Sequence, residues 1–462
     1  MPEECIMAEL LQDGSKFDVL IAGAGPAGTV LAYHLAGTGL RVGVIEIRPW
    51  EDLWGKPCGD AVAVHHFTNA RLPQPPPEVV RQRVEGVYIY SPDRRTRYRV
   101  GGEGYIIDRR RLGQYLLGKA VEKGVELYLQ HSVIAPIVKE GAVTGLRVVR
   151  PDGMVVEAKA QIVVDATGFV RAVARRFPGS LVDDELSPLD TNIAYREVWV
   201  YEDREIEEPE IIRIYLDQEL APGGYWWFFP EGAKRVNIGL GVQGGRGLSP
   251  KPFFKRLKDL DIVRGRYKVV EAGGAAVPTR RPCNSMVDNG LIVIGDAAYN
   301  VNPVHGGGMG YAFYAAYLAS QTITSALERG CRSAECLWSL NMEYMTSIGA
   351  KQAALDIFRR FLQRLSNDEL NYGMEKRLIP EMDVTEVSSR GELKVSVVEK
   401  ALIMLRGLKR PSLLRQLKTV ADYMKRIRQL YLQYPESPSS LDQWVEKVTG
   451  LIQEFEAKLS GR

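Results

Sequence analysis

The stretch that decides the fold is Gly23-Ala24-Gly25-Pro26-Ala27-Gly28, which follows the apolar run from Phe17 to Ala22. The residues after it, Thr29 to Ala36, have a helical pattern, and Arg41 to Ile47 form a second apolar strand. Glycines at this spacing allow a tight turn, close backbone approach to a pyrophosphate and close helix–strand packing. The helix N-terminus adds free N–H groups for a phosphate. We therefore predict a strand–helix–strand unit that binds a dinucleotide through Gly23, Gly25, Pro26, Ala27 and Gly28.

An acidic residue and two later glycine-containing segments extend this prediction. Glu46 follows the glycines by about 20 residues, where a carboxylate binds the ribose hydroxyls of FAD or NAD. Asp165-Ala166-Thr167-Gly168 comes next, and then Gly295-Asp296 with Gly306-Gly307-Gly308 close behind. In this order the segments describe a chain that folds back twice on one long dinucleotide, which indicates a flavin, FAD. A chance glycine turn is the plain alternative, and it does not explain the acid and the later segments.

The segments suggest individual contacts to FAD. We expect Asp296 to bind the ribityl chain, with Arg109 and Asp165 on the pyrophosphate side; buried ion pairs within the fold are the alternative for the last two. The stretch from Pro303 to Gly310 offers backbone donors at a helix start, suited to the flavin's polar edge or the pyrophosphate. His305 in this stretch is expected to be a solvated loop residue, although a role near the flavin stays open. The remaining predicted contacts are Cys58, Gly59, Gly168, Gly295, Gly306, Gly307, Gly308 and Met309.

Length and composition limit the architecture. The chain has 462 residues, too many for one hydrophobic core, and its net charge of +3 is too small for a nucleic-acid binder. We predict an α/β fold with a Rossmann-type FAD-binding domain, an antiparallel β-sheet substrate domain and a helical C-terminal region. Their predicted bounds are 14–83, 105–170 and 275–330 for the first, 84–104 and 171–274 for the second, and 331–462 for the third.

Aromatic residues mark the substrate sheet. A period-two pattern with aromatics runs from Asn192 to Val242, and residues 84–100 read as an added hairpin. Within Tyr225-Trp226-Trp227-Phe228-Phe229-Pro230, alternation places Tyr225, Trp227 and Phe229 on one face of a strand. Trp226 and Phe228 then point the other way, into the protein. A pocket lining is the favoured interpretation of the first face, with packing of all five rings in the core as the alternative.

Cysteines and uncharged stretches exclude some classes of protein. The five cysteines, at 5, 58, 283, 331 and 336, have no metal-ligand spacing, so we expect no metal site. Cys331 and Cys336 could pair in a bent loop, but two unrelated buried thiols are the favoured interpretation. Glycines interrupt the uncharged stretches 19–39 and 309–327, so we predict no transmembrane span. Residues 1–16 do not resemble a signal peptide, and we expect a cytoplasmic protein.

The C-terminal region is helical in pattern from about Ala334, with Pro435 and Pro438 as interruptions. Residues 401–430 are basic and amphipathic. We interpret the segment as a surface helix docked on its own core, while contact with the anionic inner face of a membrane stays open.

With these residues in place, the chain resembles the geranylgeranyl reductase family, a branch of the flavoproteins built like the aromatic hydroxylases. The match covers about residues 15–330. Lys56-Pro57-Cys58-Gly59-Asp60 is similar to the family's cysteine-bearing loop near the flavin, although the family often has a second glycine where Asp60 stands. The segment from Tyr225 to Pro230, followed by Gly239-Leu240-Gly241, is similar to the family's aromatic motif in the substrate cavity. The larger flavoprotein group is matched through Gly23, Gly25, Gly28, Glu46, Arg109, Asp165, Gly168, Gly295 and Asp296.

The resemblance implies a FAD-dependent reductase that hydrogenates isolated C=C bonds of geranylgeranyl chains. The substrate would be geranylgeranyl diphosphate or a digeranylgeranyl glycerophospholipid, with NAD(P)H or ferredoxin as electron donor. Hydride would come from N5 of the reduced flavin, and a proton would add to the less substituted carbon. Cys58, as proton donor or shape element, Tyr225 and Trp227 are the predicted catalytic residues. The predicted substrate-binding residues are Tyr225, Trp227, Phe229, Pro230, Gly239 and Gly241.

Three alternatives remain at this stage. A FAD-dependent monooxygenase or halogenase would use the same scaffold with oxygen, and halogenases carry a comparable Trp-rich segment. A flavin-linked quinone oxidoreductase is the second alternative, and the lack of a cysteine cluster counts against those members that carry an iron–sulfur centre. A non-catalytic prenyl-lipid carrier is the third, and the intact cofactor motifs argue against it.

Overall fold

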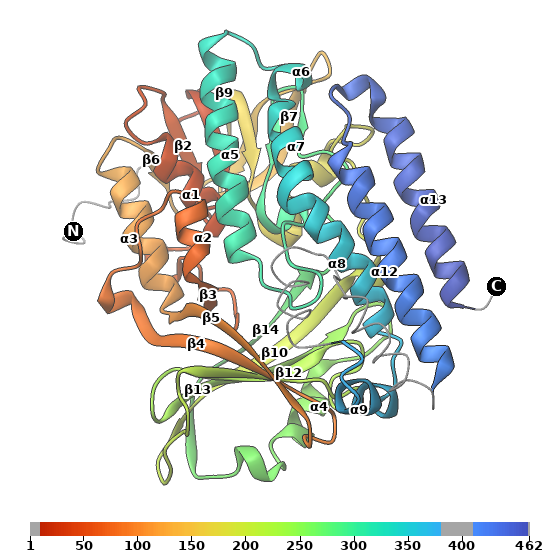
Figure 1. Ribbon diagram of the computed structural model, residues 1–462. Helices are drawn as coiled ribbons and strands as arrows, with labels where there is room; N and C mark the ends of the chain where they lie inside the picture. The colour runs from red at the N-terminus through yellow and green to blue at the C-terminus, as the bar shows by residue number, and fades with distance from the viewer. Residues whose placement is uncertain (1–9, 380–409, 461–462) are drawn as a thin grey trace.

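Two β-sheets and a layer of C-terminal helices form the protein (Figure 1). The computed structural model describes residues 10–379 and 410–460. The predicted α/β class, with a dinucleotide-binding sheet, a second sheet and a helical C-terminal region, is confirmed. The predicted domain bounds stay a prediction, and part of the region 331–462 lies outside the described residues.

The first sheet carries the glycine turn. Its central strand β1 (Lys16–Ala22) pairs in parallel with β2 (Val42–Ile45) and β9 (Val155–Asp165), and its last four side chains are fully buried. Such a continuous apolar run is typical of a parallel strand covered on both faces. The strand order is β15-β16-β9-β1-β2-β6, with β8 paired to β9 and β7 to β8. The other bounds are β6 Glu126–Tyr128, β7 Ser132–Lys139, β8 Ala142–Val149, β15 Val287–Asp288 and β16 Leu291–Val293.

Helices cover this sheet and begin close to the predicted residues. Helix α1 (Pro26–Leu35) packs against α3 (Arg109–Val121) and α5 (Met309–Glu328). It begins three residues earlier than its apolar pattern suggests, because Gly25 is an extended N-cap and Pro26 suits the first helical position. The fold thus places the start of α1 directly after β1, as the glycine motif predicts.

The second sheet has the order β14-β10-β13-β12-β11-β4-β5-β3. Neighbouring strands are antiparallel except β4 and β11, which are parallel. The hairpin expected at 84–100 is present as β4 and β5, which are longer than predicted. The bounds are β3 Ala61–Ala63, β4 Val80–Tyr90, β5 Arg97–Ile107, β10 Thr191–Tyr201, β11 Ile211–Tyr215, β12 Tyr225–Pro230, β13 Arg235–Gln243 and β14 Tyr267–Pro278.

Strand β12 separates its aromatic side chains as predicted. Trp226 and Phe228 are buried in one hydrophobic cluster, where Trp226 stacks on Tyr215 with ring centroids 3.6 Å apart. Trp227 and Phe229 belong to a different cluster on the opposite face of the strand. The alternation along the strand therefore gives this motif one face for the core and another face for a site.

The C-terminal helices pack on each other and against the rest of the chain. Helix α12 (Pro411–Leu432) lies against α8 (Ala350–Leu362) and α13 (Leu441–Leu459). Its apolar stripe is buried, which confirms docking on the protein's own core for residues 411–432; residues 401–409 of the basic segment lie outside the described residues. No helix in the described ranges is both long and apolar enough to cross a membrane. The smaller helices are α2 Val64–Asn69, α4 Pro250–Leu257, α6 Ala334–Leu337, α7 Ser339–Tyr344 and α9 Asn367–Glu375.

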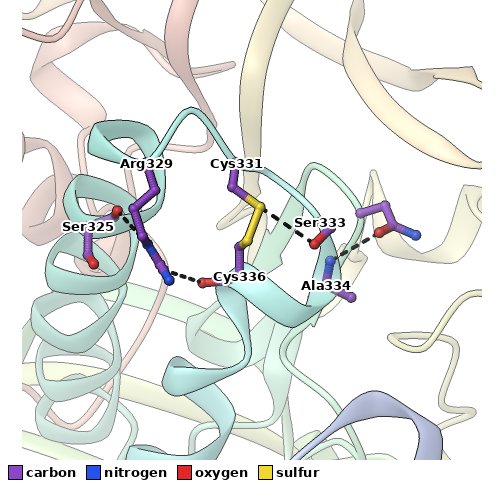
Figure 2. The surroundings of a disulfide bond; sticks show 7 residues. Ser325, Arg329, Cys331, Ser333, Ala334 and Cys336 are labelled. Atoms are coloured by element: carbon purple, nitrogen blue, oxygen red, sulfur yellow. Dashed lines mark hydrogen bonds between the residues drawn. A yellow bond between two sulfur atoms is a disulfide. The ribbon is translucent and has the colours of Figure 1, made fainter.

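The favoured interpretation of Cys331 and Cys336 as unrelated thiols is wrong, because the two residues form a disulfide (Figure 2). Gly330, with φ of +62°, reverses the chain after α5, and α6 then brings Cys336 back. The Cα atoms are 6.1 Å apart, within the range that a disulfide spans. The guanidinium of Arg329 donates to the Cys336 carbonyl at 3.2 Å and holds the same loop. The spacing of five residues gave no sign of this reversal.

Replacing both cysteines with serine is expected to lower the free energy of unfolding by about 2 kcal/mol, since the closed loop is short. Urea denaturation with tryptophan fluorescence would measure the loss. Reducing the wild-type disulfide should produce a similar shift, and the double variant should not respond to the reductant. A wild-type midpoint that is unchanged by full reduction would contradict a stabilising role.

Candidate functional site

The turn between β1 and α1 has the shape of a phosphate-binding loop. Gly23 has a φ of +97°, and a Cβ there would lie 2.6 Å from the Ala166 carbonyl oxygen. At Gly28 a Cβ would lie 1.9 Å from the Gly23 oxygen, whereas at Gly25 it would meet nothing within 4 Å. The loop is therefore packed on the protein side and open at the start of the helix. This arrangement fits the pyrophosphate of FAD.

Glu46 lies beside this turn at the end of β2. Its Oε2 accepts a hydrogen bond from the Ala24 N–H at 2.6 Å, and its Oε1 accepts from the Arg48 N–H at 2.9 Å. Burial raises the pKa of Glu46. The position is the one expected for a ribose-binding carboxylate, and that role stays a prediction.

Asp165 is fully buried and shapes the turn that follows β9. Oδ1 accepts from the backbone N–H and hydroxyl of Thr167, and Oδ2 accepts from the N–H groups of Val173 and Ala174. Gly168 in this turn has a φ of +71° and open space at its Cβ position. Asp165 thus fixes the loop from within, while Gly168 leaves room outside it.

Asp296 and the loop before α5 meet on the other side of the site. Asp296 Oδ2 pairs with Lys56 Nζ at 2.8 Å, and a Cβ at Gly308 would lie 3.2 Å from Oδ1. Asn302 Oδ1 accepts from the N–H groups of Val304 and His305, so the loop is held by its own bonds. The free donors are in the first turn of α5, which begins at Met309. Asp296 keeps an oxygen for a ribityl hydroxyl, which fits FAD.

The structure joins the cysteine loop to the aromatic strand through Asn237. The fully buried Asn237 donates from Nδ2 to the Cys58 carbonyl at 2.7 Å and accepts from Trp227 Nε1 at 3.0 Å. Gly59 lies against Phe229, because a Cβ there would be 2.8 Å from the ring. Two motifs about 170 residues apart therefore form one wall. Asn237 itself was missed, although it lies just before the selected segment Gly239-Leu240-Gly241, because spacing does not show which distant loop its side chain meets.

A buried charge cluster lies behind that wall. Asp60 has a φ of +60°, and its Oδ1 is 3.8 Å from Arg109 Nε; neither atom has a hydrogen-bond partner in the described part of the chain. Burial raises the pKa of Asp60 to about 7; Arg109 and Arg196 oppose this rise, and Glu231 and Glu271 add to it. Burial lowers the pKa of Arg109, but the nearby Cys58 and Asp60 raise it by more. The pKa of Arg109 is therefore above its ordinary value. Arg109 is thus placed beside the cysteine loop, and Asp60 is a titratable group that sequence reasoning did not select.

A large cavity opens on the other side of the same wall. Its volume is about 1310 Å³, and it extends from Cys58 across the outer face of β12 to α8, α9 and α12. Tyr225, Trp227, Phe229 and Gly241 line it. Val84 and Ile212 continue the apolar sheet face beside β12, and the helical wall is also mainly apolar, with side chains that include Leu355, Phe358, Leu370 and Leu413. The helical contribution was missed, because apolar positions on these helices read as ordinary core.

Two predicted substrate residues lie outside the lining. Pro230 ends β12, and Gly239 lies under Trp227, where a Cβ would be 2.4 Å from the ring. Tyr225 is tied to the loop before α5, because its hydroxyl donates to the His305 carbonyl at 2.6 Å. Pro230 and Gly239 can therefore influence a substrate only through the shape of the strand.

Asp60 borders both this cavity and a small polar cleft. The cleft, about 20 Å³, is lined by charged residues that include Arg81, Glu231 and Glu271. That volume holds about one water. Asp60 thus lies between a polar space and a mainly apolar space.

The parallel first sheet with its glycine turn and the mainly antiparallel second sheet define a Rossmann-type dinucleotide-binding fold with an added sheet domain. A geranylgeranyl bacteriochlorophyll reductase-like protein from Thermoplasma acidophilum superposes with a TM-score of 0.74 at 22% identity, covering 88% of this chain and 99% of that one. The myxobacterial chondrochloren halogenase, described as a FAD-dependent halogenase, has a TM-score of 0.62 at 19% identity over 85% of this chain and 97% of its own. At these identities the likeness establishes the fold alone.

Sequence comparison gives the family. Residues 190–277 match the geranylgeranyl reductase catalytic domain, and residues 18–186 match the lycopene cyclase family. The digeranylgeranylglycerophospholipid reductase of Sulfolobus acidocaldarius is 44% identical over 96% of this chain and 99% of its own length. Digeranylgeranylglycerophospholipid reductase 2 of Methanopyrus kandleri is 30% identical over 87% of this chain and 99% of its own length. The chain belongs to the geranylgeranyl reductase family and is an enzyme.

Proposed function

We propose that the protein is a FAD-dependent reductase that hydrogenates isolated C=C bonds of geranylgeranyl chains. The proposed substrates are digeranylgeranyl glycerophospholipids and geranylgeranyl diphosphate, in the synthesis of isoprenoid membrane lipids. The observation that carries the proposal is the long apolar cavity that starts at the Cys58 loop and runs along the Tyr225–Phe229 face. The names of the relatives support it.

FAD would be held by groups at the edge of the first sheet. The backbone of Gly23 to Gly28 would bind the pyrophosphate, Glu46 the ribose and Asp296 the ribityl chain, with the first turn of α5 near the polar edge. The reduced flavin would supply the hydride for the reaction. The glycine turn has a fitting shape, and each oxygen of Glu46, which accepts one backbone N–H, has a second lone pair for a ribose hydroxyl.

The aromatic wall would stabilise the positive charge that develops on the substrate. An isolated alkene accepts a hydride poorly, so a proton must add as the hydride arrives, and positive charge grows on the more substituted carbon. Trp227 and Tyr225 can stabilise such a charge with their ring faces. Asn237 fixes the position of Trp227 by accepting a hydrogen bond from the indole N–H. The apolar helical wall opposite would exclude water.

The proton would come from the wall between the cavity and the cleft. We propose that the Cys58 thiol gives its proton to the alkene carbon and that Asp60 restores it. Asp60 in turn takes a proton from the polar cleft, so one proton and one hydride enter the substrate for each C=C bond converted to C–C. The position of Asp60 between the two spaces supports this route.

The alternatives fit the site less well. A halogenase or monooxygenase shares the fold, but a cavity of this length and apolar character suits a long hydrocarbon chain. A quinone oxidoreductase would not require the cavity to continue as far as α12, and a carrier would not require a buried carboxyl such as Asp60 at the border of its cavity. NAD(P)H or ferredoxin remains the proposed electron donor.

The location of the enzyme is also a proposal. We place it in the cytoplasm, with peripheral contact to the inner face of the membrane that holds its substrate. Because the apolar stripe of α12 is buried, this contact would use exposed basic residues such as Lys418 and Lys425 rather than inserted side chains.

Anaerobic reoxidation of the flavin tests the proposed function. The protein would be reduced with dithionite without excess reductant, and geranylgeranyl diphosphate or the digeranylgeranyl lipid added without oxygen. We expect the oxidised flavin absorbance to return in proportion to the alkene added, and saturated chains to give no response. Reoxidation that occurs only with oxygen would favour a monooxygenase or halogenase.

A further inference from the structure

One lysine of the cavity wall has no hydrogen-bond or ion-pair partner in the part of the chain that the structure describes. Lys351, in the first turn of α8, lines the large cavity, and within the described residues its ammonium makes neither a hydrogen bond nor an ion pair. Its Nζ lies over the ring of Tyr311, 5.8 Å from the centroid. Burial alone lowers the pKa of Lys351 to about 8, so no carboxylate offsets the cost of the charge.

Two arginines of the cavity wall, unlike Lys351, form ion pairs with carboxylates. Arg196 bonds Glu271 at 2.9 Å, and Arg359 bonds Asp190 and Asp356 at 2.7 and 2.6 Å. A buried charge is normally retained with a partner. The unpaired ammonium of Lys351 is therefore a point at which this cavity can receive an anion from outside.

Three histidines line the same cavity near the Lys351 ammonium. His65 and His66 of α2 line the cavity with ring centroids 4.2 Å apart, and His66 lies 6.3 Å from the Tyr311 ring. His305 comes from the loop before α5 and also lines the cavity. Burial lowers the pKa of His66 to about 3 and that of His305 to about 4, and the charge of Lys351 adds to both shifts. The rings of His66 and His305 are thus neutral at neutral pH, and burial lowers the pKa of His65 as well.

The hydrogen bonding of His305 leaves a donor free. Its Nδ1 accepts from the Gly307 N–H at 3.1 Å, so the proton of the neutral ring is on Nε2. His66 is held firmly against the start of α5, because a Cβ at Gly310 would lie 2.1 Å from its ring. A phosphate group binds well where an ammonium and several neutral N–H donors can reach its oxygens.

We propose that Lys351, with His65, His66 and His305, binds the phosphate group at the polar end of the prenyl substrate. The inference rests on the proposed function. The ligand chemistry is a phosphate on a long hydrocarbon, which either a free diphosphate or the phosphate of a glycerolipid supplies. The phosphates of FAD are assigned separately, to the turn from Gly23 to Gly28.

Substrates with and without a phosphate test the site. Lys351→Met is compared with wild type on geranylgeranyl diphosphate, on the digeranylgeranyl phospholipid and on the uncharged alcohol geranylgeraniol, all in detergent. We expect KM for a phosphate-bearing substrate to rise about tenfold or more with kcat nearly unchanged, since one charged hydrogen-bond partner is lost. KM for geranylgeraniol should stay the same. The substrate whose KM rises identifies the source of the phosphate.

Control variants isolate the charge and its position. Lys351→Arg keeps the charge and should recover most of the affinity, and Lys255→Met removes an exposed charge from α4 and should behave as wild type. Inorganic pyrophosphate should inhibit wild type competitively and Lys351→Met much more weakly. Flavin content and activity on geranylgeraniol report that the variant is folded.

The outcomes separate this site from the proposed function. Equal losses on the alcohol and the phosphate substrates, or unchanged KM on all three, would overturn the phosphate site while the reductase activity stands. If wild type reduces none of the substrates, the proposed function fails. Direct binding of geranylgeranyl diphosphate to wild type and Lys351→Met then still decides whether Lys351 holds the phosphate.

Discussion

Asp60→Asn is expected to lower the rate of alkene reduction by about a hundredfold, a typical loss for a missing acid group. The amide fits the same space and keeps a polar contact to Asn237, but it cannot hold or transfer the proton. Flavin content and the rate of flavin reduction by dithionite should be unchanged. Stopped-flow reoxidation of the reduced protein by substrate measures the affected step.

The pH dependence should show the same group. Because burial raises the pKa of Asp60 to about 7, its carboxyl is mostly protonated below that pH and mostly ionised above it. The wild-type rate should therefore fall as pH rises through about 7, and the Asp60→Asn rate should be low and lack this step. The charged groups facing Asp60 are Arg109, Arg196, Glu231 and Glu271, and they are unchanged in the variant.

A matched substitution shows whether the effect is local. Asp52→Asn changes the same functional group in the half-exposed ion pairs with Arg48 and Arg110, outside the cavity. It should keep the wild-type rate and pH profile. If Asp60→Asn retained both, the proton would have to come from another group, and the proposed role of Asp60 would be wrong.

Gly28→Val is expected to abolish FAD binding and to destabilise the fold by about 3 kcal/mol or more, since overpacking of this kind is costly. A Cβ at this position would lie 1.9 Å from the Gly23 carbonyl oxygen and 3.2 Å from an Ile21 side-chain carbon. The backbone at Gly23 cannot move away from this Cβ without breaking the turn. The absorbance ratio at 450 and 280 nm, wavelengths at which flavin and protein absorb, and thermal unfolding would measure both effects.

A second glycine in the same turn separates binding from folding. At Gly25 a Cβ meets nothing within 4 Å in the protein, so Gly25→Ala should fold normally. The added methyl would face the proposed pyrophosphate, so FAD affinity should fall while stability of the flavin-free protein is kept. A Gly28→Val protein that purified with a full complement of flavin would contradict the assignment of this turn.

Local patterns in the sequence predicted the parts of the fold that depend on neighbouring residues. The glycine turn, the β1–α1–β2 unit and the two faces of β12 follow from spacing within a few residues, so they could be predicted. The relation of the Cys58 loop to Trp227 could not, because it depends on Asn237 of another strand. The resemblance to a family indicated both motifs but not the bond that joins them.

The remaining errors and omissions have the same origin. Cys331 and Cys336 meet because the chain reverses at Gly330, and spacing alone does not show a reversal. Asp60 and Lys351 are ordinary charged residues in the sequence. Burial among groups from distant segments raises the pKa of Asp60 to about 7 and, among the described residues, leaves the ammonium of Lys351 without a hydrogen-bond or ion-pair partner.

The central claim is that the protein saturates isolated double bonds in prenyl chains. Mass spectrometry of geranylgeranyl diphosphate and of a digeranylgeranyl glycerophospholipid, after anaerobic incubation with the reduced protein, tests it most directly. We predict products heavier by two hydrogens for each alkene reduced. Unchanged masses with a protein that holds reducible FAD would contradict the claim.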